Sequence, residues 1–443
     1  MATATPPVPP GPTDPANPAD PANGDQPVTV VGIGADGWAG LAEPARAALR
    51  AADTVIGGPR QLDLLPAEVT AVRLPWPSPL RPAVPGLLAE HSKRRLAVLA
   101  SGDPMFYGIG RALAETVGPE RLRVLPHPSS VSHACARLGW PLEDTEVVSL
   151  VGRPLDSLGL ALHPGRRLLV LSADAGTPAA AAALLTERGY GPSRLRVLEQ
   201  LGGPQERQLD GRAEDWPHQP GAALNLIAVE CAPAPGAPRG SLVPGLPDDS
   251  YESDGQLTKR HIRAATLASL APLPGELLWD VGGGSGSIAI EWLRAHRSCR
   301  AVSVERDPVR AERIARNAAA LGVPGLRVVT GRAPEALDQL PTPDAVFIGG
   351  GLTAPGLLET CWNALPPGGR LVANTVTLES EALLTEWYRR HGGELLRLAV
   401  AHAVPVGSFT GWRQAMPVTH WSVVKPATEQ PETHPEKQGE PTP

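Results

Sequence analysis

The sequence predicts an α/β protein with two globular segments, and three observations support that fold class. Short apolar runs alternate with Ala-, Leu- and Arg-rich stretches of helical character, as in parallel sheets with helices on both faces. A Pro- and Gly-rich stretch without periodicity, 233–247, separates the segments 28–232 and 248–425, and each segment is as long as a domain. The ends, 1–27 and 426–443, offer almost nothing to bury, and we expect them to be disordered tails.

The apolar runs and helical stretches predict the elements in order. In the first segment, strands are expected at 28–34, 95–102, 121–126, 167–172 and 223–230, and helices at 41–52 and 179–188. In the second segment, strands are expected at 276–283, 300–305, 326–331, 344–350, 369–375 and 419–425, and one helix at 288–294. A further helix begins after Asp307 as its N-cap, with Pro308 at its first position, and ends at Gly322. Ligands are expected at the carboxyl ends of the strands.

Composition excludes several classes of protein. A net charge of −6 with 19% charged residues does not suit a non-specific nucleic-acid binder, although a local RNA site stays open. No apolar run is long enough to cross a membrane, and the N-terminus lacks the basic and apolar regions of a secretory signal. The four cysteines lie far apart without a CxxC pair, which argues against a zinc ribbon or a disulfide scaffold. We therefore expect a cytoplasmic protein without a bound metal.

The second segment carries a glycine-rich turn between a predicted strand and a predicted helix. Asp280 ends the strand, and Gly282, Gly284 and Gly286 follow in a G-x-G-x-G spacing that lets a ligand lie against bare backbone. Glu305 ends the next strand, where a carboxylate can accept hydrogen bonds from ribose hydroxyls. A nicotinamide-dinucleotide enzyme is the specific rival, and the glycine spacing, which is not G-x-G-x-x-G, counts against it.

These motifs, with DAVFIGGG at 344–351 and LPPGGRLVANT at 365–375, resemble the class I S-adenosylmethionine-dependent methyltransferases. The resemblance implies a Rossmann-like domain. It also implies that the cofactor is contacted by Gly282, Gly284, Gly286 and Glu305. Two further contacts are expected: Ala333, in a turn that could frame an adenine, and Thr258, which matches a position that the narrower family described next uses near the cofactor.

The lead-in to this segment, YESDGQLTKRHIR at 251–263, narrows the resemblance to methyltransferases that methylate C15 of a precorrin and decarboxylate it. Lys259, Arg260 and Arg263 either form a solvated helix face or converge on the carboxylates of such a substrate. Asn374 and Thr375 end a strand on the expected functional side. They either contact the substrate or cap a turn.

The first segment opens with a literal G-x-G-x-x-G, from Gly32 to Gly37, after a strand. A dinucleotide site would also need an acid at the end of the next strand, but the next apolar run, 54–58, ends in glycine. We therefore reject a dinucleotide site here.

Further stretches identify the first segment more specifically. SGDPMFYG at 101–108, the run from His127 to Arg153, LSADAGTPAAAAALL at 171–185 and LEQLGGPQERQLDG at 198–211 resemble the two-lobed tetrapyrrole methylases. The resemblance implies S-adenosylmethionine in a cleft between two α/β lobes, contacted by Gly32, Gly34, Asp103 and Met105.

This segment departs from its relatives at two places. Val151 stands where many of them have a histidine, and PHPSS at 126–130 replaces PGISS or PAPSA. The role of that missing histidine cannot be transferred to this chain. His127 or His133 could replace it, or each could be a surface or satisfied histidine.

The order of the two halves resembles a fusion family of corrin-ring (cobalamin) biosynthesis. That resemblance implies methylation of a precorrin at C5 by the first half, and methylation at C15 with decarboxylation of the C12 acetate by the second. It implies two S-adenosylmethionine sites, a tetrapyrrole substrate, neither nucleic-acid nor membrane partners, and a homo-oligomer. No catalytic residue can be named. The order of the steps and the presence of cobalt in the substrate stay open.

Two rival functions remain. One is a methyltransferase of RNA or protein with the first half as an accessory domain, and the other is a non-catalytic carrier of pathway intermediates. The SGDPMFYG stretch argues against the first rival, and the two intact glycine loops argue against the second.

Overall fold

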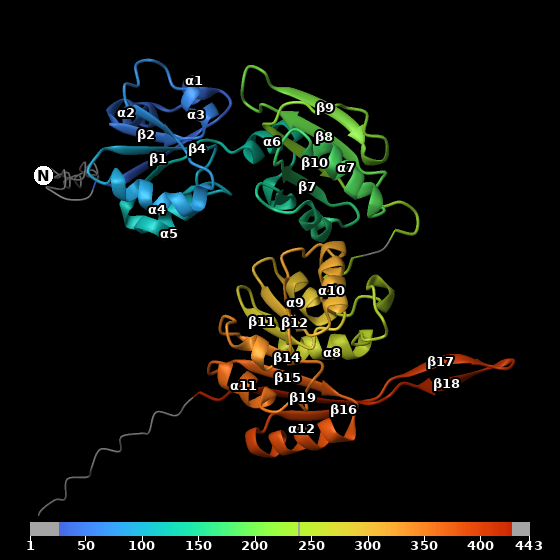
Figure 1. Ribbon diagram of the computed structural model, residues 1–443. Coiled ribbons are helices and arrows are strands. Elements are labelled where there is room, and N and C mark those ends of the chain that lie inside the picture. Colours follow the sequence, from blue (N-terminus) through green and yellow to red (C-terminus); the bar gives the residue numbers. More distant parts are fainter. Residues whose placement is uncertain (1–25, 238–239, 428–443) are drawn as a thin grey trace, which may run out of the picture. The chain divides into compact units, whose positions relative to one another are not determined.

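The computed structural model describes residues 26–237 and 240–427. Most of both predicted tails, 1–25 and 428–443, and residues 238–239 of the predicted linker lie outside these ranges. The chain forms two compact units: the first holds the residues up to Ser149 with Arg196–Leu209 and Gly221–Ala228, and the second holds the remainder. Because this division passes through the strands of one sheet, each sheet is described with its own helices (Figure 1).

The first sheet has the order β3-β2-β4-β1-β5, and its strands run parallel. Its strands are β1 (Val28–Ile33), β2 (Thr54–Gly57), β3 (Val72–Pro75), β4 (Leu96–Ser101) and β5 (Leu122–Leu125). Its helices are α1 (Gly37–Gly40), α2 (Glu43–Ala51), α3 (Pro59–Asp63), α4 (Leu80–Glu90), α5 (Gly110–Val117) and α6 (Ser130–Leu138).

Alternate side chains of β1 enter two separate cores, one on each face of this sheet. Val31 and Ile33 pack with Leu49 of α2, whereas Val30 packs with Leu113 of α5. Helices therefore cover both faces, as the alternating pattern predicts. Because β4 and β5 both pair in parallel with β1, the loops that follow these three strands lie at one edge of the sheet.

The second sheet has the order β6-β7-β10-β8-β9. Its elements are β6 (Glu146–Ser149), β7 (Arg167–Leu171), α7 (Thr177–Glu187), β8 (Arg194–Glu199), β9 (Arg207–Arg212) and β10 (Asn225–Glu230). Residues 28–232 thus contain two sheets, in agreement with the two-lobed fold that the sequence predicts.

The third sheet has the order β13-β12-β11-β14-β15-β19-β16. Its strands are β11 (Leu277–Val281), β12 (Arg300–Glu305), β13 (Arg327–Thr330), β14 (Ala345–Ile348), β15 (Arg370–Thr375), β16 (Glu394–Leu398) and β19 (Val418–Val424). Its helices are α8 (Arg260–Leu270), α9 (Ser287–Ala295), α10 (Pro308–Ala320), α11 (Leu357–Ala364) and α12 (Leu378–His391). The sheet is Rossmann-like, but the expectation of a wholly parallel sheet is wrong because β19 pairs antiparallel with both β15 and β16.

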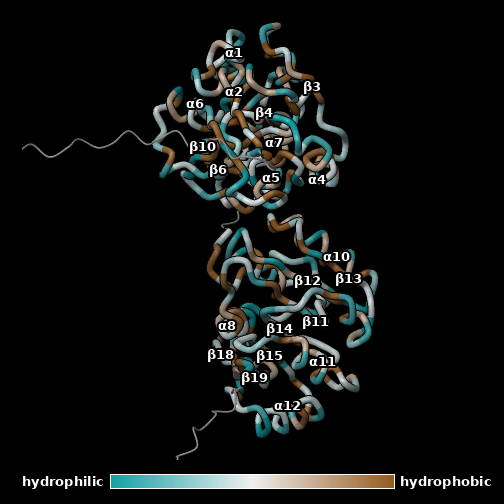
Figure 2. Tube along the Cα trace, turned by 90° about the vertical axis from the view of Figure 1, so that its left-hand side faces the viewer, coloured by the Kyte–Doolittle hydropathy of each residue, from teal (hydrophilic) through white to brown (hydrophobic). Residues whose placement is uncertain are grey.

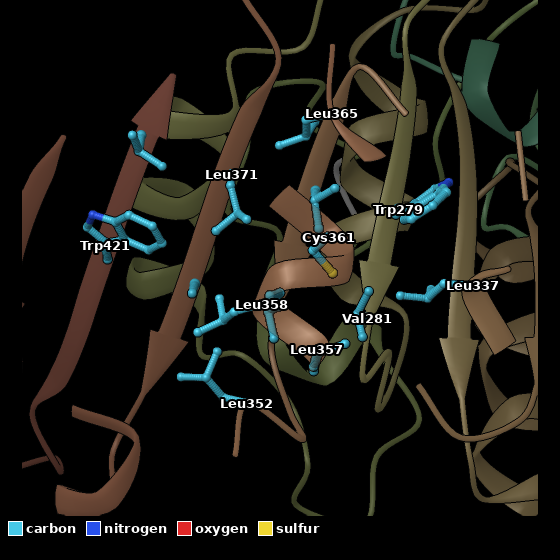
Figure 3. Packing of buried hydrophobic residues seen from close by; sticks show 14 of the residues in the cluster. Trp279, Val281, Leu337, Leu352, Leu357, Leu358, Cys361, Leu365, Leu371 and Trp421 are labelled. Atoms are coloured by element: carbon cyan, nitrogen blue, oxygen red, sulfur yellow. The ribbon is translucent and has the colours of Figure 1, made fainter. Parts of the chain in front are cut away.

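The third sheet separates two hydrophobic cores. Trp279 and Val281 of β11 pack with α11 and with Trp421 of β19 on one face (Figure 3). Leu278 packs with Ile288 of α9 and Ile314 of α10 on the other. In Figure 2, much of α12 is teal, consistent with its many charged residues on the outside of this body.

A hairpin of β17 (Ala401–Val406) and β18 (Phe409–Gln414) extends from the third sheet as a long arm (Figure 1). Most of its apolar side chains are exposed, and the exposed fraction of both Phe409 and Trp412 is 79%. We call this segment, 401–414, the hairpin arm.

The C-terminal end of the predicted linker packs against the helices of the third sheet. Leu246 is buried in the core beneath α9. The backbone N–H groups of Gly245 and Leu246 donate to the carboxylate of Glu291 on α9, at 2.5 and 3.0 Å. Across residues 26–237 and 240–427, no helix combines the length and the apolar character needed to cross a membrane.

Candidate functional site

The glycine-rich turn after β11 has the tight shape that its sequence predicts. Gly282 and Gly286 adopt left-handed φ angles of 76° and 78°, a region that residues with a Cβ rarely occupy. An added Cβ at Gly282 would lie 2.7 Å from the backbone nitrogen of Gly350, and one at Gly286 would lie 2.7 Å from Cγ2 of Ile314. The glycines are therefore required by the backbone and its packing, and their contact with a cofactor stays a prediction.

Glu305 links the three loops that follow β11, β12 and β13. Its buried carboxylate accepts from the N–H of Gly284 at 2.8 Å and from the N–H of Asp307 at 3.0 Å. Its backbone oxygen accepts from the N–H of Gly331 at 3.0 Å, which ties in the turn that carries Ala333. Each carboxylate oxygen accepts one of these N–H groups, and its remaining acceptor capacity can receive a hydroxyl.

Asp280 lies beneath the same turn and is 1% exposed. The hydroxyl of Ser303 donates to its Oδ2 at 3.0 Å. Burial raises the pKa of Asp280 to about 7, and the nearby Glu305 acts in the same direction. The site therefore contains a carboxyl group that is protonated over much of the acidic range.

The lead-in segment 251–258 is bound to this turn and to α10. The hydroxyl of Ser285 donates to the backbone oxygen of Gln256 at 2.7 Å, and the side chain of Asn317 donates to the backbone oxygens of Glu252 and Ser285 at 3.0 and 2.9 Å. Thr258, two residues beyond Gln256, is half-buried. The lead-in is thus part of the site's framework.

Ion pairs also fix the lead-in. Asp254 pairs with Arg310 at 2.9 Å and with Arg313 at 3.1 Å. The hydrogen bond from Arg310, followed by that from Arg313, holds the pKa of the Asp254 carboxyl well below its usual range.

The three basic residues near the start of α8 separate into two kinds. The side chains of Lys259 and Arg260 are exposed. Arg263 is fully buried and pairs with Glu291 at 2.6 Å and with Asp248 at 3.2 Å. Neither alternative for Arg263 is therefore correct, because its guanidinium is enclosed by its own counter-ions on the inward face of α8.

Asn374 and Thr375 lie at the end of β15 with different partners. The side chain of Asn374 donates to the hydroxyl of Thr266 at 2.8 Å, and its oxygen lies 2.8 Å from Nδ1 of His420. The Thr375 hydroxyl accepts from the N–H of Thr377 at 3.3 Å, a local turn contact. Both polar side chains therefore have hydrogen-bond partners within the fold. Their contact with a substrate stays a prediction.

His420 is a buried polar residue that sequence reasoning missed. Its other ring nitrogen lies 3.0 Å from the hydroxyl of Ser269, and burial lowers its pKa. Only the pairing of β19 with β15 brings it beside Asn374, and no local motif marks it.

At the first sheet, the loops that follow β1, β4 and β5 meet. The N–H of Gly102 donates to the backbone oxygen of Ile33 at 3.1 Å, and the N–H of His127 donates to the backbone oxygen of Gly102 at 3.3 Å. A Cβ at Gly32 would lie 2.0 Å from that same oxygen. The structure thus brings the predicted Gly32, Gly34 and the SGDPMFYG loop to one edge of the sheet.

Within the SGDPMFYG loop, Asp103 accepts from the N–H of Met105 at 2.8 Å. The Met105 side chain is exposed at 52%. The loop is therefore held by its own aspartate and presents Met105 outward, and its role toward a cofactor stays a prediction.

Two histidines follow β5. His127 is nearly buried, with Nε2 3.2 Å from Oδ2 of Asp36, and its ring centroid lies 6.4 Å from that of His133. The alternative that His127 is a surface histidine is therefore wrong. Val151, at the position where many relatives have histidine, is exposed.

The arrangement of the side chains described above does not indicate a metal site. Within the described ranges, no cluster of three or more His, Cys, Asp or Glu side chains is placed to hold a metal ion. The expectation of a protein without a metal stays a prediction.

Comparison with known proteins assigns each half to a family model. Residues 249–425 match the model described as a precorrin methyltransferase domain, and residues 27–217 match the tetrapyrrole (corrin/porphyrin) methylases. A Mycobacterium tuberculosis (strain CDC 1551 / Oshkosh) protein named precorrin-6Y C(5,15)-methyltransferase (decarboxylating) is 50% identical over 401 residues, 90% of this chain and 100% of that protein.

Two shorter relatives each match about two fifths of the chain. The cobalt-precorrin-7 C(5)-methyltransferase of Salmonella typhimurium (strain LT2) is 33% identical over 180 residues, 41% of this chain and 88% of the relative. The probable cobalt-precorrin-6B C(15)-methyltransferase (decarboxylating) of Pyrobaculum aerophilum is 34% identical over 174 residues, 38% of this chain and 89% of the relative.

Proposed function

The chain belongs to the precorrin-6Y C(5,15)-methyltransferase (decarboxylating) family, and from this premise we propose that it methylates precorrin-6Y at C5 and C15 with loss of CO2 in cobalamin biosynthesis. The observation that carries the proposal is the 50% identity that extends over 90% of this chain and the whole length of the relative. We place the decarboxylation at the C12 acetate, where the conjugated macrocycle can accept the electron pair that the departing CO2 leaves behind.

We further propose a division of labour, with C5 methylation in residues 28–232 and C15 methylation with decarboxylation in residues 248–425. The two family models support this division, because they match different halves of the chain. The two shorter relatives support it as well, since one is named for the C5 reaction alone and the other for the C15 reaction with decarboxylation.

Both halves belong to S-adenosylmethionine-dependent families, and we propose one cofactor site in each. S-adenosylmethionine supplies an activated methyl group. In the second half, Glu305 would accept from the ribose hydroxyls while it holds the N–H groups of Gly284 and Asp307. Gly282, Gly284 and Gly286 would leave the backbone bare beside the cofactor, and Thr258 and Ala333 would border it. In the first half, Gly32, Gly34, Asp103 and Met105 would take the corresponding positions.

Residues near each cofactor would align the electron-rich macrocycle carbon with the methyl group and keep water away, which is most of what such a displacement requires. We propose Lys259 and Arg260, whose side chains are exposed, as contacts for the macrocycle's carboxylates. Asn374 and Thr375 are weaker candidates, because other groups in the fold already bind their side chains.

We also propose that the protein acts in the cytoplasm as a homo-oligomer. None of its four cysteines forms a disulfide, which suits a reducing compartment. The hairpin arm exposes Phe409 and Trp412, and an apolar surface of this kind is typical of an interface. A second copy of the chain is the partner that we propose for it.

Mass spectrometry of precorrin products tests the function. The intact chain with precorrin-6Y and S-adenosylmethionine should add two methyl groups and release CO2. A piece spanning residues 26–232 should act only at C5, and a piece that begins at Gly240 should act only at C15 and decarboxylate. The second piece must include Leu246 because that residue is buried in its core.

The same samples test the rival functions. Methylation of RNA or protein in place of a precorrin would contradict the proposal and favour a methyltransferase of another substrate. Absence of S-adenosylhomocysteine binding in calorimetry would favour a non-catalytic carrier.

A further inference from the structure

Asp36 and His127 form a nearly buried pair at the carboxyl end of β1. Nε2 of His127 lies 3.2 Å from Oδ2 of Asp36, and the two side chains are 9% and 25% exposed, respectively. Asp36 comes from the loop between β1 and α1, and His127 from the loop between β5 and α6. Residues far apart in the sequence thus bring a carboxylate and an imidazole together at the edge of the sheet where ligands are expected.

Two glycines make room for this pair. A Cβ at Gly34 would lie 2.5 Å from Oδ1 of Asp36 and 2.8 Å from Nε2 of His127. A Cβ at Gly40 would lie 1.8 Å from Oδ2 of Asp36. Any other residue at these positions would displace the carboxylate. These glycines therefore make space for a specific pair of polar side chains, in addition to shaping the turn.

Both partners have hydrogen-bonding capacity that the fold does not use. Oδ1 of Asp36 and Nε2 of His127 are buried atoms with no hydrogen-bond partner among the described residues. Buried polar groups are nearly always satisfied, and exceptions gather where function needs them. The two loops that hold the pair meet the SGDPMFYG loop at Gly102, so the unused groups lie where the C5 reaction is proposed.

Methylation of a ring carbon replaces a hydrogen by a methyl group and therefore releases one proton. The ring's π electrons form the new C–C bond while the S–CH3 bond breaks and its electron pair remains on sulfur. The C5–H bond then breaks, its electrons return to the ring, and the proton needs an acceptor. A carboxylate backed by a neutral imidazole is such an acceptor.

We propose that Asp36 and His127 together accept the proton released at C5, an inference that rests on the proposed function of the first half. Asp36, the more exposed partner, takes the proton on its carboxylate, and Oδ2, which lies 3.2 Å from Nε2 of His127, passes it to that nitrogen. The pair then consists of an imidazolium and a carboxylate 3.2 Å apart, a separation at which opposite charges attract. Asp36 is the proposed catalytic residue, and His127 is a positioning residue that stores the proton.

Other titratable groups on neighbouring elements include His133, Glu206 and Asp103. His133 of α6 is the neighbouring histidine. Beyond it, Glu206 is bound by Arg137 at 2.6 Å and by the N–H of Gly202 at 2.7 Å. Asp103 on the neighbouring loop is occupied by the N–H of Met105. Glu206 and Asp103 thus have partners, whereas Asp36 and His127 keep unused groups.

The test uses the full chain with precorrin-6Y and S-adenosylmethionine, and it follows C5 and C15 products separately in each sample. Asp36→Asn and His127→Gln should each lower the C5 methylation rate by about 100-fold or more, the usual size of a general-base effect. C15 methylation and decarboxylation should continue, so that the C15-methylated, decarboxylated intermediate accumulates. His218→Gln, which replaces a histidine bound to the backbone oxygen of Asp210, serves as the matched control and should change neither rate.

The pH profile separates storage of the proton from a merely structural role. If His127 holds the transferred proton, His127→Gln should change the dependence of kcat/KM for C5 methylation on pH relative to the wild type. A substrate deuterated at C5 adds a readout that does not depend on how much variant folds, because the isotope effect should increase in Asp36→Asn.

Retention of the C5 rate within about twofold in both variants would overturn the proposal. So would an unchanged pH profile in His127→Gln, or an unchanged isotope effect in Asp36→Asn. Each of these results leaves the proposed function standing, because the wild type would still form both products. A wild type that forms neither product would instead contradict the function itself.

Discussion

Single residues near the glycine-rich turn of the second half combine structural and chemical roles. The Glu305 carboxylate holds the N–H groups of Gly284 and Asp307, and it is also the group that we expect to receive the ribose. A substitution there removes the ligand's acceptor and leaves two backbone donors without partners. Its effect should therefore be confined to the second half.

Glu305→Ala should abolish C15 methylation while C5 methylation of a supplied C15-methylated substrate continues. Calorimetry with S-adenosylhomocysteine should show binding fall from two sites per chain to one. Glu312→Ala, on an exposed position of α10, is the matched control and should leave both sites intact. Unchanged C15 methylation in Glu305→Ala would refute the role assigned to Glu305.

The buried Asp280 should make the stability of the second half depend on pH. Because its pKa is about 7 in the folded protein, the fold holds a proton that the unfolded chain releases near pH 4. The protonated carboxyl therefore contributes fully at low pH, and this contribution is lost as the pH rises through about 7.

Asp280→Asn should remove this dependence and be more stable than the wild type above pH 7, by as much as about 4 kcal/mol. Chemical unfolding from pH 4 to pH 8, followed by tryptophan fluorescence, measures the difference. Asp338→Asn, at an exposed position, should leave the pH dependence unchanged. A parallel pH dependence in Asp280→Asn and the wild type would contradict the assignment.

Sequence reasoning predicted the positions of residues in local motifs, whose contacts with a cofactor stay predictions, and it missed the contacts that only tertiary structure brings about. Glu305 was found because it ends a strand about 20 residues after the glycines. The burial of Arg263 could not be predicted from α8 alone, because its partner Glu291 lies on another helix. The pairing of Asp36 with His127 was missed for the same reason, since 90 residues separate them.

At the scale of elements, strands with strong apolar runs were predicted and strands with polar or exposed faces were not. The strands β11 and β14 are buried throughout, β12 is buried after its first residue, and all three were predicted. The exposed strands of the hairpin arm and the mostly exposed β16 were missed. The antiparallel direction of β19 was also missed, because a strand's apolar pattern does not specify its direction.

The turn after β11 offers a test of how strongly its backbone conformation depends on glycine at position 282. Gly282→Ala should destabilise the second half by about 1–3 kcal/mol, because the new Cβ meets both a left-handed φ and the backbone of Gly350. Gly325→Ala is the matched control, since a Cβ there meets nothing within 4 Å. Thermal unfolding of both variants measures the effect, and equal stability of the two would contradict the role of the turn.

At the scale of the whole molecule, two methyltransferase folds of different design occupy one chain. Two sheets lie within residues 28–232, and a third sheet with its hairpin arm lies within 248–425. Their order along the chain was the most specific sequence signal, because neither motif set alone identifies the combination. The hairpin arm adds the feature that concerns assembly.

Replacing Phe409 and Trp412 together by serine should lower the mass of the protein in solution, as measured by light scattering, because it removes apolar surface from the proposed interface. Val309→Ser, an exposed apolar residue of α10, is the control and should leave the mass unchanged. A wild type that is monomeric at micromolar concentration would contradict the interface.

The anchoring of Gly245 and Leu246 by Glu291 limits how the two halves can be recombined. Extra residues inserted upstream of Gly245 would leave both of these hydrogen bonds in place. The same insertion between Leu246 and α8 would pull the chain away from a carboxylate that also neutralises Arg263. Chimeras that exchange one half for a foreign methylase should therefore be joined upstream of Gly245.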